Sequence, residues 1–332
     1  MKKNLVIILL LVISLSFCHS ARAQDKEEVM DHALVLAQSM KKSGIDLDNE
    51  YQLIYKAIMS EEKAAEEKEK EKAIEVTQTV ESYARFMPSS DVEVMPGEVK
   101  VSEAFFEYGF ETKVFGKLPV KFSLASKYIG LENTTAVPLP AHLTGISTGI
   151  EFTLPFFTLD KTYMRIELNP SFYTDDWSFD TSSFRMPTYI YGIYLPNDKW
   201  TFVLGAAVFP DYKEEVLPII GFIYKPNDKL TFNITSKRPN ITYKLNDKIG
   251  LFVEGGGTRD EFEVKRASQE NVVLLYKETH AGAGLKYRFN EFIQSSFTVG
   301  GVFNRTIKYI DGQGKVNVDG GLYTELRLNA RF

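Results

Sequence analysis

Long stretches in which apolar and polar side chains alternate are the feature that most constrains the fold of this chain. In the run "VSEAFFEYGFETKVF", Ala104, Phe106, Tyr108 and Phe110 stand at even positions, and the odd positions include Glu103, Glu107, Glu111 and Lys113. Successive side chains of a strand point to opposite faces of a sheet, so this run predicts a long strand with one apolar face. The same alternation returns in "GISTGIEFTLPFF", "TYMRIELNPSF" and "FIQSSFTVGGVF". Residues 98–332 are therefore predicted to be all β.

A short motif separates several of these strands. It appears as "PNDKWTF" and "PNDKLTF", then as "LNDKIGLF", with a looser copy in "FNEFIQSSF". Asparagine and aspartate tolerate the left-handed backbone conformations that tight hairpins require, so each copy predicts a short turn. Longer polar connections are predicted at the opposite strand ends, in "TDDWSFDTSS", "PDYKEE", "GGTRDEFEVKRASQEN" and "DGQGK".

Alternation alone does not separate a membrane barrel from a soluble β-sandwich, because both have one apolar face. Strand length favours the barrel, since several runs approach the roughly 10 residues that a tilted strand needs to cross a bilayer. Short turns that alternate with long polar loops, and aromatic residues such as Tyr189 and Tyr194 near strand ends, favour it as well. We predict a transmembrane antiparallel up-and-down β-barrel of about 12 strands, within a range of roughly 10 to 14. A soluble periplasmic β-sandwich binding protein is the weaker alternative.

The first 23 residues have the organisation of an export signal. Two lysines precede an apolar run at 5–17, and the small residues of "ARA" follow, so cleavage is predicted between Ala23 and Gln24. Cys18, the only cysteine, would leave with this peptide, and the mature chain could then form no disulfide. The apolar run is too short for a comfortable spanning helix.

The next region differs from the rest of the chain. Residues 24–86 combine apolar residues at helical spacing with the charge-rich run "EEKAAEEKEKEKAIEV", and predict a periplasmic α-helical segment. We expect a solvent-exposed spacer helix, and a docking arm for a periplasmic partner is the alternative. Residues 87–97 contain two prolines and a glycine and are predicted to be a linker before the barrel.

Composition excludes several functions. The net charge of −5 and the pI of about 5.6 argue against a nucleic-acid partner, which would need clustered lysine and arginine. No cluster has the spacing of zinc ligands, and "VEGGGTRD" lacks the G-K-[ST] ending of a phosphate-binding loop. We therefore predict no metal site and no cofactor.

Charged residues on the inward faces of the predicted strands are the candidate lumen lining. These are Glu103, Glu107, Glu111, Arg165, Glu167, Glu325 and Arg327. A polar inward face is typical of a passive pore for small solutes. Charges of both signs could instead pair and fill a narrow lumen, which would leave a structural role.

A catalytic alternative rests on one histidine. His280 follows Glu278 by two residues, so both side chains lie on the same side of the predicted strand. An acid beside a histidine is part of the machinery that activates a nucleophile, but no recognisable motif marks a nucleophile nearby. We predict that the protein is not an enzyme, with a lipid-modifying barrel enzyme that uses His280 as the alternative.

The chain ends in "GGLYTELRLNARF", a strand pattern that stops on an aromatic residue. Leu326, Leu328, Ala330 and Phe332 share its apolar face. This end resembles the final strand of Gram-negative outer-membrane barrels, and the resemblance implies that the barrel-assembly machinery reads those four residues. The alternating strand pattern extends this resemblance over residues 98–332. The repeated N-D-K hairpins are most similar to an uncharacterised outer-membrane β-barrel family of the DUF6268 type. It implies residence in the outer membrane in contact with lipid.

Overall fold

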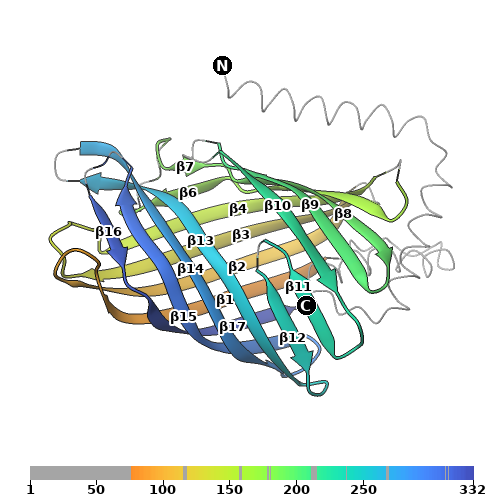
Figure 1. The fold of residues 1–332 in the computed structure, drawn as a ribbon. Helices are drawn as coiled ribbons and strands as arrows, with labels where there is room; N and C mark the ends of the chain where they lie inside the picture. Colours follow the sequence, from red (N-terminus) through yellow and green to blue (C-terminus); the bar gives the residue numbers. More distant parts are fainter. Residues whose placement is uncertain are drawn as a thin grey trace.

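The computed structural model describes residues 76–332, apart from 115–117, 157–158, 178, 180, 211–214, 237, 267–268, 311 and 313. The predicted signal peptide and most of the predicted helical segment lie outside these residues. The described part forms one sheet of 17 strands (Figure 1). The strands are β1 (Thr77–Asp91), β2 (Glu98–Val114), β3 (Leu118–Asn133), β4 (His142–Pro155), β5 (Thr162–Leu168), β6 (Ser171–Thr174), β7 (Phe184–Arg185), β8 (Thr188–Asn197), β9 (Trp200–Val208), β10 (Val216–Tyr224), β11 (Leu230–Ile234), β12 (Asn240–Lys244), β13 (Ile249–Arg266), β14 (Gln269–Arg288), β15 (Ile293–Tyr309), β16 (Lys315–Val318) and β17 (Gly321–Arg331).

The sheet closes on itself as an antiparallel barrel. The last strand, β17, pairs with β1 from Thr79 opposite Arg331 to Phe86 opposite Thr324. Three wall strands are interrupted, since β5 continues into β6, β7 into β8 and β16 into β17, so the wall has 14 strands. The predicted all-β barrel is confirmed, at the upper end of the predicted range. The β-sandwich alternative is wrong, because one sheet closes on itself and no second sheet packs on it among the described residues.

The barrel begins earlier than the sequence pattern predicted. Strand β1 lies where we expected the end of the helical segment 24–86 and the linker 87–97, and it pairs with β2 along most of its length. Both boundaries are therefore wrong for this stretch. The reason is the weak alternation of β1, whose outward positions include the small residues Ser82 and Ala84. The predicted loop "GGTRDEFEVKRASQEN" is likewise mostly strand, because β13 and β14 continue through it.

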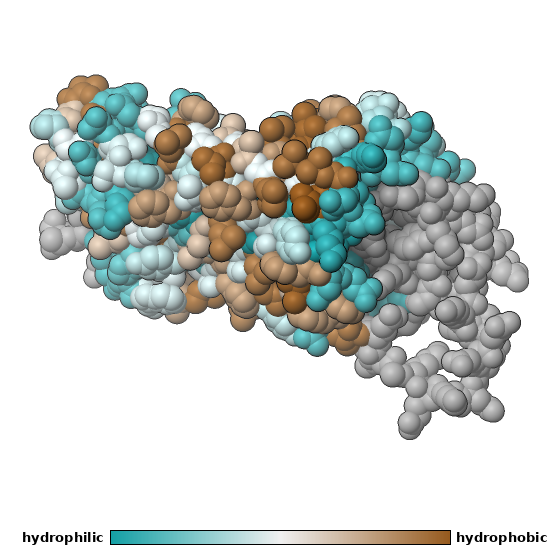
Figure 2. Space-filling view, turned by 90° about the horizontal axis from the view of Figure 1, so that it is seen from below, coloured by the Kyte–Doolittle hydropathy of each residue, from teal (hydrophilic) through white to brown (hydrophobic). Residues whose placement is uncertain are grey.

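Side chains alternate between lipid-facing and lumen-facing positions as predicted. Figure 2 shows apolar side chains gathered over the middle of one face of the barrel, with hydrophilic ones toward its ends. Exposed apolar residues come from strands around the barrel: Phe106, Tyr108, Phe110, Leu124, Leu204, Ile220, Val253, Leu285, Phe297, Val299, Leu322 and Leu326. An apolar outer face on a closed barrel is what a bilayer requires, because closure pairs the first strand of the sheet with the last.

The two ends of the barrel differ. Thr77 and Phe332 lie at one end, which we call the terminal end, and the short N-D-K turns lie there too (Figure 1). At the opposite end, the far end, β13, β14 and β15 extend well beyond the short strands β11 and β12. The wall is therefore much taller on one side than on the other.

The repeated turns share one hydrogen-bonding arrangement. In each, the asparagine Oδ1 accepts the backbone N–H groups of the residues two and three positions later, at 2.8–3.2 Å. The four asparagines are Asn197, Asn227, Asn246 and Asn290. A short side chain that replaces a backbone acceptor explains why the motif recurs at hairpins.

Replacing Asn227 with alanine is expected to lower the free energy of unfolding by about 1–2 kcal/mol, because two hydrogen bonds of the turn are lost. Urea unfolding of the detergent-folded barrel, followed by tryptophan fluorescence, measures the change. Asn227→Asp keeps the oxygen acceptor and is expected to stay near the wild-type value. Equal losses in both variants would show that the side-chain oxygen is not what stabilises the turn.

Candidate functional site

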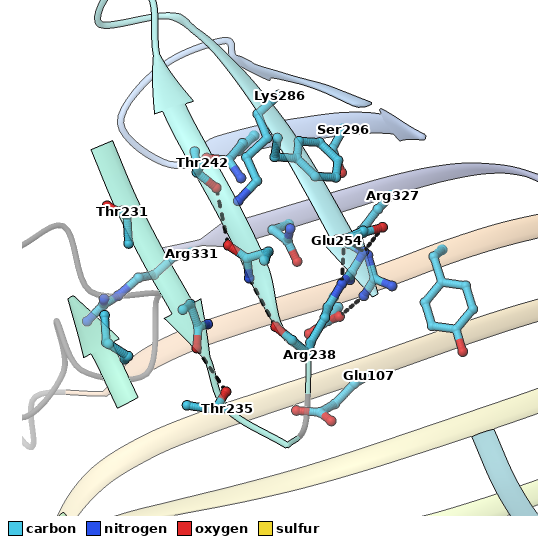
Figure 3. Close-up of a pocket in the computed structure, with 18 of the residues that line it drawn as sticks. Glu107, Thr231, Thr235, Arg238, Thr242, Glu254, Lys286, Ser296, Arg327 and Arg331 are labelled. Atoms are coloured by element: carbon cyan, nitrogen blue, oxygen red, sulfur yellow. Dashed lines mark hydrogen bonds and ion pairs between the residues drawn. The ribbon is translucent and has the colours of Figure 1, made fainter. Parts of the chain in front are cut away.

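A cavity of ≈ 1590 Å³ occupies the lumen on the side of the terminal end. Its lining reaches residues of the short turns, including Lys199, Asp228 and Asp247, and extends inward along β11 to β15. Figure 3 shows Thr231, Thr242, Lys286 and other polar side chains around this space. The inward faces of these strands therefore enclose a polar chamber inside an apolar wall.

The residues predicted to line the lumen do lie on inward faces, but at different depths. Glu107, Glu167 and Arg327 line the cavity. Glu103, Arg165 and Glu325 are buried deeper among other side chains, and Glu111 is partly buried on the same face of β2. Arg165 has its own partners, since its Nε lies 3.2 Å from Glu151 and 3.1 Å from the hydroxyl of Thr153.

Two of the predicted lumen residues, Glu103 and Glu325, belong to an ion network centred on Arg85. The guanidinium of Arg85 lies 2.7 Å from the carboxylate of Glu325, 3.0 Å from Glu278 and 3.5 Å from Glu103. All four side chains are almost completely buried. The sequence pattern did not identify Arg85 as a lumen residue, because β1 was predicted to be helical. The alternation of Tyr83 and Arg85 with the small outward residues of β1 was the available signal.

Further groups complete this network across the lumen. Arg305 lies 3.3 Å from Glu278, and the hydroxyl of Tyr276 donates to the same carboxylate at 2.6 Å. The Lys127 ammonium lies 3.1 Å from Glu103 and 2.7 Å from Asp260. Buried charges are costly unless they are paired and hydrogen-bonded. The buried ion network is tolerated because its charged groups have several partners each. It joins strands on opposite sides of the barrel.

Beyond the network, apolar side chains fill the far end of the lumen. The buried cluster consists of Met87, Val92, Val99, Val101, Ile129, Leu131, Leu143, Phe262, Val264, Val272, Leu274, Tyr276, Val302, Ile307, Tyr309, Val316, Val318 and Tyr323. These side chains come mostly from β1 to β4 and from β13 to β17, and they pack against one another in one cluster. The direct path along the barrel axis is therefore obstructed at the far end.

The predicted pair Glu278 and His280 lies inside this packed region. The His280 Nδ1 is 3.9 Å from the Glu278 carboxylate, which already binds Arg85 and accepts from Tyr276. The His280 ring packs edge-on against Tyr323, with ring centroids 5.7 Å apart. Within the described part of the chain, no serine, threonine or cysteine side chain hydrogen-bonds His280. Among these residues, therefore, His280 has no hydrogen-bonded hydroxyl or thiol beside it that could act as the nucleophile of a lipid-modifying enzyme.

Arg238 is a charged cavity residue that was not predicted from the sequence. Arg238 lies in the connection between β11 and β12 and points into the chamber (Figure 3). Its guanidinium makes two hydrogen bonds with Glu254, at 2.8 and 2.9 Å, and lies 3.2 Å from Glu325. A bidentate arginine–carboxylate pair is strong and directional, so it holds this short hairpin against the lumen wall.

The described residues lack two further features, a metal site and a membrane-spanning helix. No group of histidine, cysteine, aspartate and glutamate side chains there is arranged to hold a metal ion. Nor does that part of the chain contain a helix with the length and apolar character to cross a membrane.

Comparison with known proteins gives only distant likenesses. No family model matches the sequence, and no curated protein matches it. Among solved structures, the chain is similar to the COG4313 outer membrane channel from Pseudomonas putida F1, with 9% identity and a TM-score of 0.42 over 80% of this chain and 98% of the other. It is similar to the translocator domain of the autotransporter NalP from Neisseria meningitidis, with 13% identity and a TM-score of 0.37 over 83% and 96%. The KdgM porin has 10% identity and a TM-score of 0.34 over 76% and 99%. The comparisons therefore show no family for the chain. Its structure is a closed 14-stranded antiparallel barrel with an apolar outer face and a polar chamber.

Proposed function

We propose that this protein is a Gram-negative outer-membrane barrel that passively admits small solutes, and that it belongs to the DUF6268-type family that its sequence resembles. The observation that carries the proposal is the polar chamber of ≈ 1590 Å³ inside a closed barrel with an apolar outer face. An even number of strands brings both termini to the same end, where the short turns also lie. Short turns face the periplasm in barrels of this class, so the chamber opens toward the periplasm.

The charges of the chamber suit uncharged or weakly charged solutes. Lys121 lies 3.0 Å from Glu107, and Arg238 is paired with Glu254, so charges of both signs lie side by side within the lining. Paired charges hydrate the chamber without producing a field of one sign. A small polar or amphipathic molecule fits such a chamber better than a multivalent ion does.

Purified protein in liposomes is expected to raise the flux of small solutes above that of protein-free liposomes, and a double variant that fills the chamber is expected to lower that flux several-fold. Thr231→Trp with Thr242→Trp places two rings on inward positions of β11 and β12. Stopped-flow liposome swelling with a series of solutes measures the rates.

The matched control is Leu251→Trp, which adds a ring on the outer face of β13 and is expected to leave the flux unchanged. A folded wild-type protein that moves no solute of the series would reject the transport proposal. The structural role would then be the better one, and the packed far end of the lumen is the observation that favours it.

The assembly role of the chain end belongs to the same proposal. Leu326 and Leu328 are exposed on the outer face of β17, and Phe332 is exposed directly after this strand, where the barrel-assembly machinery could bind them as the strand is delivered. Ala330 shares that face but is nearly buried. We propose outer-membrane lipid and the assembly machinery as partners, and a periplasmic partner for residues 24–75, which lie outside the described part.

A further inference from the structure

The wall of the barrel has a notch on the far-end side of the short strands β11 and β12. These two strands have 5 residues each, whereas β10 has 9 and β13 has 18. Strand β11 pairs with β10 only at Phe222–Tyr224, and β12 pairs with β13 only as far as Glu254. Above these points, and within the described residues, no strand pairs with β10 at 216–220 or with β13 at 256–262 on the edges that face the notch.

Strand β6 borders the notch on its remaining side, toward the far end. Thr174 of β6 pairs with Glu263 of β13, and the Lys265 N–H lies 3.2 Å from the carboxylate of Asp175. The ring of Tyr173 packs edge-on against Phe262, with centroids 5.3 Å apart. The notch is therefore a bounded opening, which we call the window, with β10, β13, β6 and the β11–β12 connection around it (Figure 1).

The chamber extends through the wall at the window. In a closed wall, only alternate residues of a strand reach the lumen. Strands β11 and β12 follow this rule, with Thr231 and Asn233 from one, and Thr242 and Lys244 from the other, in the lining. By contrast, β10 contributes the consecutive residues 217–219. Strand β13 contributes 257–260. Inward and outward residues of both edges thus line one continuous space.

The position of the window places it within the membrane. Val216 and Ile220 are exposed on the outer face of β10, and Val253 is exposed on β13 just below the window. An outward cluster of aromatic rings surrounds β6 and β7 on the side of the far end. It consists of Phe172, Trp177, Phe179 and Phe184. Aromatic girdles lie at the membrane–water boundary, so the window lies between this boundary and the apolar belt, at the level of the outer leaflet.

The borders of the window are unlike each other. Strand β10 is apolar on both faces, with Leu217 and Ile219 inward and Val216 and Ile220 outward. The opposite border, on β13, contributes the polar side chains of Thr258, Arg259 and Asp260 to the lining. Water or the polar groups of a solute solvate such side chains, whereas hydrocarbon does not. A passage with an apolar wall and a hydrogen-bonding wall matches a molecule that has both characters.

We propose that the window is a lateral passage through which an amphipathic solute, with an apolar chain and a hydrogen-bonding head group, moves between the chamber and the outer leaflet. This inference rests on the proposed transport function and names its substrate class and route. The packed far end supports it, because the apolar cluster and the ion network obstruct the axial route. The solute slides its apolar part along β10 while its head group bonds to the edge of β13.

The experiment blocks the window after the protein has folded. The chain is produced from Gln24, without the only cysteine, and carries Pro218→Cys at the exposed edge of β10. Leu204→Cys is the matched control, because this side chain also faces lipid but lies on β9, which is paired on both sides. Each variant is reconstituted in liposomes and compared before and after reaction with a bulky maleimide.

The probe is a fluorescent single-chain lysophospholipid added to the outer leaflet, and its loss of extractability by albumin measures transfer. Wild-type protein is expected to accelerate this transfer over protein-free liposomes. Modified Pro218→Cys is expected to return toward the protein-free rate, while the unmodified variant and modified Leu204→Cys keep the wild-type rate. Transfer that is unaffected by modification of Pro218→Cys, or a wild-type protein that moves small solutes but not the probe, would overturn the lateral passage. If neither small solutes nor the probe move, the transport function itself fails.

Discussion

Replacing Arg85 with methionine is expected to destabilise the barrel by about 3–5 kcal/mol, because the change leaves several buried carboxylates without their shared cation. Arg85 lies within 3.5 Å of carboxylate oxygens of Glu103, Glu278 and Glu325, and none of these side chains has appreciable contact with solvent. Methionine preserves much of the volume, so the loss reports on charge and not on a cavity. Urea unfolding of the folded barrel in detergent, followed by tryptophan fluorescence, measures the difference.

Lys100→Met is the matched control for this variant. Lys100 lies 2.7 Å from Glu132, but this pair is largely exposed, and exposed pairs contribute only about 0–1 kcal/mol. A second comparison removes the cation and its closest acid together, in Arg85→Met with Glu325→Gln, and is expected to recover part of the loss. A loss below about 1 kcal/mol in Arg85→Met would show that the buried network does not stabilise the fold.

Deleting Phe332 is expected to produce the second large effect, a several-fold loss of folded barrel in the outer membrane. Phe332 exchanges two backbone hydrogen bonds with Gln78 at 2.9 Å, and its exposed ring stacks against Phe292 with centroids 6.4 Å apart. The deletion removes both the end of the closing pair and the terminal aromatic side chain. The folded fraction in isolated membranes is measured by its heat-modifiable migration in gels.

Two controls separate recognition during assembly from stability of the product. Phe332→Tyr keeps an aromatic ring and is expected to assemble like the wild-type chain. Refolding of the deletion variant in detergent, where no assembly machinery is present, is expected to succeed in good yield. Unchanged folded protein in the membrane would contradict the proposed signal, and poor refolding in detergent would assign the defect to stability alone.

The closed barrel, its lumen-facing charges and its turns were predictable because each follows from local pattern. Alternation assigns a face to every residue of a strand, and this placed Glu107 and Arg327 correctly on the inner side. The turn motif predicted the short hairpin turns, since the asparagine of each copy makes the same two hydrogen bonds. These are properties of residues close together in the chain.

The ion network and the window were not predictable in the same way. Arg85 meets Glu278 and Glu325 only after the barrel has closed, and its strand lacks the strong outward apolar residues that identify β2. Alternation also does not indicate how far each strand extends along the barrel axis. One signal for the window was present, because the stretch between the turns at Asn227 and Asn246 must supply two strands and is too short for both to cross a membrane.

The pairing of β1 with β17 has a consequence for the order of events in biogenesis. Almost every other contact in the wall joins strands that are near neighbours along the chain, whereas this seam joins Thr79 to Arg331. Contacts between distant residues carry the largest loop-closure entropy and form late. The N-terminal strand must therefore keep one edge without its native partner until translation and export have delivered the last residues. Vulnerability to aggregation or proteolysis is concentrated in that interval, which ends only when the final strand arrives.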